Sequence, residues 1–181
     1  MTDHQPVLRP DAGHVRQLLL DARLDAVWYQ QTPGSGLGAP PPDAATHEVD
    51  LDVVLRLSTG AVWLTWQREN LVEGLAVDPV AGPGTGTHWY DAGASRWAAA
   101  VGDTVSEVGL GWQVGEAGGP ESLWAVRLGF AGGAEVLVAM GELDGEDRPG
   151  YFPESLLVLF DRAEARGYLP AGATAGAFPG E

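Results

Sequence analysis

The chain has 181 residues, with 25 acidic residues against ten arginines and neither cysteine nor lysine, so its formal net charge is −15. The two absences exclude disulfides, thiolate nucleophiles, cysteine metal sites, Schiff-base chemistry and the phosphate-binding lysine of a P-loop. The negative charge disfavours nucleic acid and anionic membrane surfaces, since both are bound through Lys and Arg, and it favours a basic protein partner.

Length and composition predict one domain over residues 1–181, because a chain of this size with 45% hydrophobic residues can bury a sizeable core. Residues 1–23 mix acids and arginines with apolar positions, so we expect no secretory signal. No apolar run approaches the length of a membrane-spanning helix. With the absence of cysteine, this favours the cytoplasm. Heavy use of Ala, Gly, Pro and Arg is typical of GC-rich bacterial coding.

The first predicted element is a helix from Asp11 to Arg23, with Asp11 as its N-cap. Its apolar residues recur at helical spacing: Val15, Leu18, Leu19 and Ala22. The β-branched and aromatic residues of segment 24–31 favour a strand, with continuation of the helix as the alternative. Residues 32–46 are rich in Gly and Pro and are expected to form a loop.

Strict alternation of apolar residues predicts one strand over residues 47–57. A turn at residues 58–60 and a β-rich run at 61–66 complete a hairpin. Residues 123–130 and 134–143 have the same pattern around an Ala-Gly-Gly turn and predict a second hairpin. The shared Arg-Leu pair before each turn makes an internal duplication a hypothesis.

Residues 78–104 have turn and loop composition, and alternation in 104–114 predicts a further strand. The apolar run 155–160 is typical of a central strand covered on both faces. A short helix at 161–167 and a flexible tail at 170–181 are expected to follow. The fold class is therefore α+β: a mostly antiparallel sheet or partly closed barrel of about six to eight strands with an N-terminal helix.

Three carboxylates, Glu48, Asp50 and Asp52, alternate along the predicted strand 47–57 and so share its polar face. Carboxylates projecting in one direction can hold a hard cation, with His47 joining them if the start of the strand bends. The alternative, which we favour, is a solvated strand face, because metal ligands normally come from several elements. We therefore predict no metal and no cofactor.

Catalytic motifs are not evident in the sequence. His88 with Asp91 is the best local pair for acid–base chemistry, but no G-x-S-x-G motif supplies a nucleophile. The glycine-rich segments 34–38 and 82–86 lack the strand before and the helix after that a phosphate-binding loop needs. The sequence thus predicts no catalytic residues, and a protein without enzymatic activity is favoured.

Tryptophan is abundant, with seven residues in the chain. Trp66 and Trp124 are in phase with the buried rows of their strands and are expected in the core, whereas Trp63 lies on the opposite face. Trp89 and Trp97 lie in or beside a loop. Half-exposed aromatic rings commonly anchor a partner, because they offer a large contact area at low entropic cost.

These observations predict a non-catalytic acidic binding protein, such as an inhibitor or immunity-type protein, that engages a basic protein partner. The predicted binding surface comprises Trp63, Trp89, Tyr90, Trp97, Trp112, Glu48, Asp50 and Asp52. One alternative is a small-molecule-binding barrel with Trp63, Trp89, Trp97 and Trp112 at the mouth of its cavity. Another is a carboxylate- or metal-dependent hydrolase that uses Glu48, Asp50 and Asp52 with His88.

Overall fold

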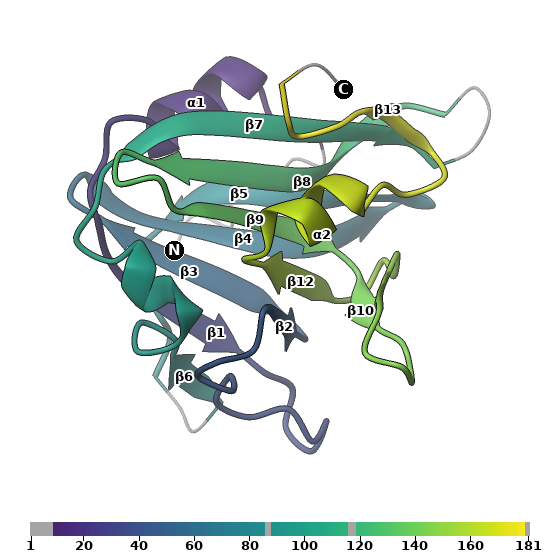
Figure 1. The fold of residues 1–181 in the computed structure, drawn as a ribbon. Coiled ribbons are helices and arrows are strands. Elements are labelled where there is room, and N and C mark those ends of the chain that lie inside the picture. The colour runs from purple at the N-terminus through teal and green to yellow at the C-terminus, as the bar shows by residue number, and fades with distance from the viewer. Residues whose placement is uncertain (1–8, 86–87, 116–118, 180–181) are drawn as a thin grey trace.

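The computed structural model describes residues 9–85, 88–115 and 119–179, and Figure 1 shows two β-sheets packed against each other with short helices at the periphery. Helix α1 (Ala12–Leu19) begins at Asp11, whose carboxylate accepts hydrogen bonds from the backbone N–H groups of Gly13 and His14. This confirms the predicted N-cap. The helix ends before Arg23 because the chain reverses at Asp21, which adopts a left-handed φ of 62°.

The first sheet has five strands in the order β5-β4-β3-β1-β6, and we call it the five-stranded sheet. Its members are β1 (Leu24–Gln30), β3 (Asp52–Leu57), β4 (Gly60–Glu69), β5 (Val72–Val80) and β6 (Trp89–Asp91). Strand β1 confirms the strand interpretation of this segment over a continued helix. The predicted hairpin is also confirmed, because β3 pairs with β4 up to Leu57 opposite Gly60.

The second sheet has six strands in the order β13-β7-β8-β9-β12-β2 and is called the six-stranded sheet. Its members are β2 (Thr46–Val49), β7 (Val105–Val114), β8 (Glu121–Phe130), β9 (Glu135–Met140), β12 (Leu156–Leu159) and β13 (Ala173–Ala175). A small separate hairpin pairs β10 (Glu142–Leu143) with β11 (Pro149–Gly150). The pairings are antiparallel and the sheets do not close into a barrel, which confirms the antiparallel-sheet form of the predicted fold. The described residues contain thirteen strands, more than expected, because several span only two to four residues.

The prediction of one continuous strand over residues 47–57 is wrong. Residues up to Val49 form β2 in the six-stranded sheet, and residues from Asp52 form β3 in the five-stranded sheet. Between them, the Asp50 backbone N–H bonds to the Gln31 side chain instead of to a strand. The apolar alternation continues through this crossing because Val49 and Val53 face the same core between the sheets. A period of two detects the buried face but not a change of sheet.

The six-stranded sheet is apolar on both faces. Its inner face joins the main core between the sheets, and its outer face carries a second hydrophobic cluster. Helix α2 (Arg162–Gly167) lies over this outer face, in front of β9 and β12 in Figure 1. All four residues of β12 are buried, and the strand lies between β9 and β2. The central position predicted from its apolar run is therefore confirmed.

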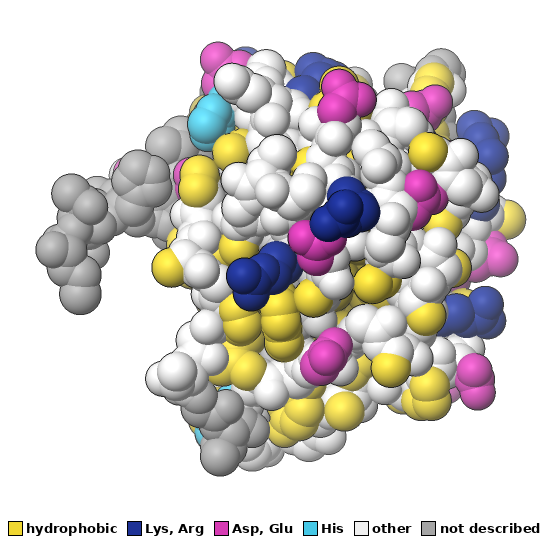
Figure 2. All heavy atoms as spheres, turned by 90° about the vertical axis from the view of Figure 1, so that its left-hand side faces the viewer, with side chains coloured by type: hydrophobic (Ala, Val, Ile, Leu, Met, Phe, Trp, Pro, Cys, Tyr) yellow, Lys and Arg dark blue, Asp and Glu magenta, His cyan; other side chains and the backbone are white. Residues whose placement is uncertain are grey.

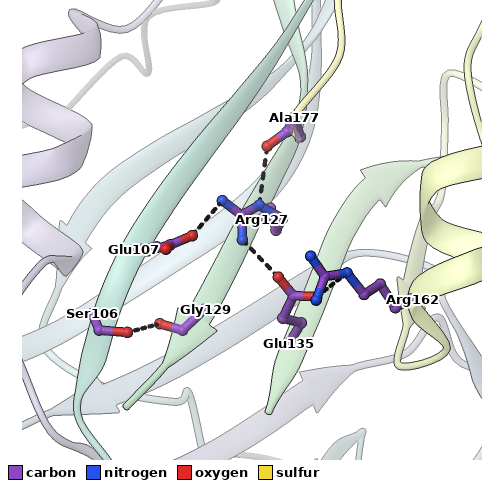
Figure 3. Close-up of polar contacts among 7 residues, drawn as sticks. All are labelled: Ser106, Glu107, Arg127, Gly129, Glu135, Arg162 and Ala177. Atoms are coloured by element: carbon purple, nitrogen blue, oxygen red, sulfur yellow. Dashed lines mark hydrogen bonds and ion pairs between the residues drawn. The ribbon is translucent and has the colours of Figure 1, made fainter. Parts of the chain in front are cut away.

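A buried arginine fixes the C-terminal segment on this outer face (Figure 3). The Arg127 side chain is 4% exposed and forms ion pairs of 2.9 Å with both Glu107 and Glu135. Its Nε donates to the Ala177 carbonyl at 3.1 Å. The Phe178 ring is 5.2 Å from the guanidinium of Arg127. The segment 170–181, for which the sequence predicts a flexible tail, thus contains β13 and this anchor, while residues 180–181 lie outside the described residues.

The region 78–104, expected to be turns and loops, also contains β6 and the 3-10 helix η1 (Arg96–Ala99). Trp97 in η1 is fully buried in the main core. Among the described residues, no helix is long and apolar enough to cross a membrane.

Candidate functional site

The outer face of the five-stranded sheet carries a row of aromatic and acidic side chains. Residues directly opposite each other in antiparallel strands point to the same face of a sheet. The register of β6, β1, β3, β4 and β5 places the following residues in one row across the sheet: Asp91, Trp28, Val54, Trp63 and Asp78. Two tryptophans therefore occupy the middle of the row, and an aspartate lies at each end.

The neighbouring row contributes a third tryptophan and a third aspartate. In the same strand order it consists of Trp89, Gln30, Asp52, Thr65 and Ala76. The tryptophans of both rows are partly exposed, and they belong to neither hydrophobic cluster of the described residues. We call this surface the tryptophan face, defined by Trp28, Trp63, Trp89, Asp52, Asp78 and Asp91.

Strand alternation explains why the tryptophans point away from the core. In β1 the two neighbours of Trp28, Val27 and Tyr29, are fully buried between the sheets. In β4 the neighbours of Trp63 are the buried residues Val62 and Leu64. Side chains of successive strand residues point to opposite faces, so burial of these neighbours directs both indoles outward.

Between the tryptophans, the side chains of the tryptophan face are shielded from solvent. Val54 and Ala76 are fully buried although they lie on the outer side of the sheet, and Asp52 is only 8% exposed. This burial raises the pKa of the Asp52 carboxyl above its ordinary value, while a hydrogen bond from Thr65 lowers it. The indole Nε1 of Trp63 is buried and has no acceptor in the described part of the chain. A buried donor without a partner leaves hydrogen-bonding capacity that a bound group can use.

Strands β5 and β6 are the two edge strands of the five-stranded sheet, and residues 81–88 connect them in the sequence. This segment packs closely on the tryptophan face at Gly84, where a Cβ atom would lie 2.7 Å from Nε1 of Trp89. A Cβ atom at this position would therefore require Trp89 or the Gly84 backbone to shift. Residues 86–87, which include part of the glycine-rich segment 82–86, lie outside the described residues.

The structure brings three of the predicted surface residues together, namely Trp63, Trp89 and Asp52. It places two others inside or behind the sheet. Trp97 is fully buried, and its Nε1 donates to the Tyr29 hydroxyl at 2.6 Å. Tyr90 is paired with Tyr29 and so lies on the side opposite Trp89.

The remaining predicted residues lie on other elements. Trp112 is in β7 of the six-stranded sheet and packs against the main core. With Trp97 buried, the rings predicted to line one cavity mouth occupy separate layers and do not form a common wall. Glu48 is in β2. Asp50 lies in the short connection from β2 to β3 and accepts a hydrogen bond from the Thr32 backbone.

The three carboxylates expected on one strand face therefore do not form a row, because the strand that was to carry them is divided between two sheets. Within the described residues, no three His, Asp or Glu side chains are placed to hold a metal ion. Asp91, predicted to pair with His88, accepts a hydrogen bond from the Gly93 backbone at 2.8 Å. Its carboxylate then lies at one end of the tryptophan row.

Sequence reasoning did not select Trp28, Asp78 and Asp91 for this surface. Alternation along β1 identifies Trp28 as facing away from Val27 and Tyr29, so its outward direction was available in the sequence. Its position two strands from Trp63 was not, because it depends on the pairing of β1 with β3 and of β3 with β4. Long-range pairing is what makes these residues one surface.

Figure 2 shows how charged side chains are distributed on one face of the molecule. On the face shown in Figure 2, arginine and acidic side chains are interspersed among hydrophobic ones, and hydrophobic side chains gather in its lower half. The net charge of −15 is therefore not laid out as a continuous acidic area on that face. A binding site must be identified from a local arrangement rather than from the overall charge.

Comparison of the chain with protein-family models, with curated proteins and with solved structures gives no match. The chemistry of the tryptophan face must therefore be read from its own residues. Indole rings attract cations through their negative faces, and carboxylates at both ends of the row add to that attraction. The arrangement suits a cationic side chain lying flat across the sheet.

Proposed function

We propose that the protein is a non-catalytic, cytoplasmic binding protein whose tryptophan face takes a basic segment of a protein partner. The observation that carries the proposal is the row in which Trp28 and Trp63 lie between Asp78 and Asp91. The overall charge of −15 supports it, since long-range attraction steers a basic partner toward the molecule. An inhibitor or immunity-type protein, which binds and neutralises another protein, has this profile.

The energetics favour arginine as the contacting residue. A cation over an indole ring contributes about 0.5–1 kcal/mol when exposed and about 2 kcal/mol or more when desolvated. The planar guanidinium can stack on Trp28 or Trp63 and still donate hydrogen bonds to a carboxylate at its edge. Tryptophan and arginine are also the residues that most often dominate the energy of protein interfaces.

The proposal is tested by titrating the full chain with a hexa-arginine peptide and, separately, a hexa-glutamate peptide, followed by tryptophan fluorescence. We expect saturable binding of the arginine peptide that weakens with salt. The variant Trp63→Leu keeps an apolar side chain but removes the ring face, and it should weaken binding by about tenfold. The double variant Asp78→Asn with Asp91→Asn should weaken it by a similar factor.

A matched control separates local recognition from general charge. The double variant Asp43→Asn with Glu69→Gln also removes two negative charges, from exposed positions outside the tryptophan face. It should change the affinity less than twofold. Equal weakening in both double variants, or full binding by Trp63→Leu, would show that the peptide responds only to net charge and would overturn the proposal.

A further inference from the structure

A second candidate site lies at the tip of the hairpin formed by β4 and β5. A cavity of about 440 Å³ opens between this tip, the ends of β7 and β8, and the residue that follows β11. Binding pockets for small molecules range from about 300 to 1,000 Å³, so the volume suits one small ligand. The polar side chains that line the cavity belong to Arg68, Glu73, Gln113, Ser122 and Tyr151.

Strand register separates this cavity from the tryptophan face. Arg68 of β4 lies opposite Glu73 of β5, two positions beyond the pair of Trp66 and Leu75. Leu75 is buried in the main core, and Trp66 packs against it. Side chains two positions apart point to the same face of a strand, so Arg68 and Glu73 continue the core-facing rows. Trp63 points to the opposite face.

Side-chain contacts bring the different walls of the cavity together. The Ser122 hydroxyl donates to the Glu73 carbonyl at 2.7 Å, and Nε2 of Gln113 donates to the Tyr151 hydroxyl at 2.8 Å. Burial, aided by the negative charge of Glu73, raises the pKa of Tyr151 above its ordinary value, while the hydrogen bond from Gln113 lowers it. Residues from β5, β7, β8 and the segment after β11 therefore meet at one site.

The charges at the cavity already neutralise one another. The Arg68 guanidinium forms ion pairs with Glu73 at 2.7 Å and with Glu154 at 3.5 Å. A cationic ligand would compete with Arg68 for these carboxylates, and an anionic ligand would be repelled by them. The electrostatics therefore favour an uncharged ligand.

The cavity also offers both hydrogen-bond donors and hydrogen-bond acceptors. Gln113 is only 3% exposed, and its amide oxygen accepts no hydrogen bond from the described residues. The Tyr151 oxygen accepts from Gln113, so its own proton remains available for donation. Arg68 pairs with one oxygen of Glu73, Oε1, and leaves Oε2 as a second acceptor. A hydroxyl group both donates and accepts, so several hydroxyls on one ligand match this set.

Apolar contact is available at the rim of the same cavity. Asn70 and Leu71 form the two-residue turn of the hairpin, with left-handed φ values of 48° and 72°. Asparagine tolerates this conformation, whereas leucine adopts it rarely. The Leu71 side chain is also 80% exposed, and the Tyr151 ring beside the cavity is partly exposed. An exposed leucine held in a strained conformation indicates a contact surface, because neither feature stabilises the free protein.

We infer that this cavity is a binding site for a saccharide, an uncharged ligand with hydroxyl groups at its edge and an apolar C–H face. The hydroxyls exchange hydrogen bonds with Gln113, Tyr151 and Glu73. The C–H face packs on Leu71 and on the Tyr151 ring. The site is separate from the tryptophan face and does not depend on the function proposed for that face.

Small glycosides test the inference on the full chain. The neutral probes are methyl glucoside, methyl galactoside and methyl mannoside, each used at about 50 mM so that millimolar affinities are detected. Nitrogen–proton NMR spectra would follow the side-chain amide of Gln113 and the backbone amide of Leu71. We expect at least one glycoside to shift both signals in a saturable way. Its uronate and amino-sugar counterparts, which add a negative or a positive charge, should bind at least about threefold more weakly.

Two variants with matched controls assign the binding to the cavity. Leu71→Asn relieves the left-handed strain and should leave thermal stability unchanged or higher, yet weaken glycoside binding at least about threefold. Leu169→Asn changes another exposed leucine and should leave binding unchanged. Tyr151→Phe keeps the ring but removes the hydroxyl donor, and it should also weaken binding at least about threefold. Tyr90→Phe, outside the cavity, is its control, and thermal unfolding checks the fold of each variant.

Three results would overturn the inference. The first is the absence of shifts at Gln113 and Leu71 with all three glycosides. The second is tighter binding of a charged counterpart, or unchanged affinity in either cavity variant. The third is a set of shifts confined to Trp28, Trp63 and Trp89, which would assign the saccharide to the tryptophan face instead. Failure of the arginine peptide to bind the tryptophan face would leave this inference unaffected.

Discussion

The outer faces of the two sheets differ in how far their apolar side chains are covered by other parts of the chain. On the six-stranded sheet, Trp124, Leu137 and Leu157 are covered by helix α2 and the C-terminal segment and belong to a second hydrophobic cluster. On the five-stranded sheet, Trp28 and Trp63 remain partly exposed and belong to neither hydrophobic cluster of the described residues. One chain therefore supplies a packed cover for one sheet and leaves indole rings accessible on the other.

The covered face and the tryptophan face are expected to contribute differently to folding stability and to binding. Covered apolar surface contributes to folding by about 25 cal/mol per Å², whereas partly exposed rings retain surface that can be buried later against a partner. The covered face also contains an ion pair with a buried arginine, an arrangement that holds one segment in place. We expect substitutions on the covered face to change the free energy of unfolding and substitutions on the tryptophan face to change binding.

The largest difference in the free energy of unfolding is expected between variants of two tryptophans. Trp124 is 1% exposed, so Trp124→Ala should lower the free energy of unfolding by about 3–5 kcal/mol through lost burial and a cavity. Trp63→Ala, on the partly exposed face, should lower it by only about 1 kcal/mol. Urea denaturation of both variants measures the difference. Equal losses would show that the tryptophan face is part of the stabilising core.

Arg127→Met removes the anchor of the C-terminal segment. It leaves the Ala177 carbonyl without its donor and Glu135 with Arg162 as its remaining partner. Breaking such a buried ion pair costs about 3 kcal/mol. Hydrogen exchange should become faster at residues 173–179 before the rest of the sheet is affected. The exposed arginine variant Arg56→Met, on the other sheet, is the control and should leave exchange in this segment unchanged.

Gly109→Ala tests how closely the C-terminal segment packs against β7 of the six-stranded sheet. A Cβ atom at this position would overlap the Ala177 carbonyl oxygen, so the C-terminal segment must shift away from β7. Such overpacking costs about 1–3 kcal/mol, measured by thermal unfolding. Gly145→Ala has open space around its position and should cost little. A Gly109→Ala protein as stable as the parent would show that the segment is loosely held.

The smallest effect concerns Asp52 beneath the tryptophan face. Its folded-state pKa is raised, so the folded protein binds a proton more tightly than the unfolded chain. Its contribution to stability is therefore lost as the pH rises from the unfolded pKa through the raised folded value. Asp52→Asn should remove this fall, making the variant more stable than the parent near neutral pH, by less than about 1 kcal/mol. Unfolding measured from pH 3 to 7 would show a larger decline in the parent; parallel curves would contradict the assignment.

Much of the local structure was predictable from the sequence. Asp11 was identified as the N-cap of α1, the hairpin of β3 and β4 followed from alternation around Gly60, and the apolar run in β12 indicated a central strand. These features depend on neighbouring residues, whose propensities and spacing act within a few positions along the chain. The outward direction of Trp63 followed from the same rule.

The tertiary structure decided which of these elements share a surface. Alternation assigned Glu48 and Asp52 to one strand face, but the chain changes sheets between them, because both halves bury residues in the same core. Alternation likewise could not place Trp28 and Asp91 in one row with Trp63, since that grouping depends on pairing between strands distant in sequence. Local periodicity determines whether a side chain points inward or outward, whereas only long-range packing determines which outward side chains become neighbours.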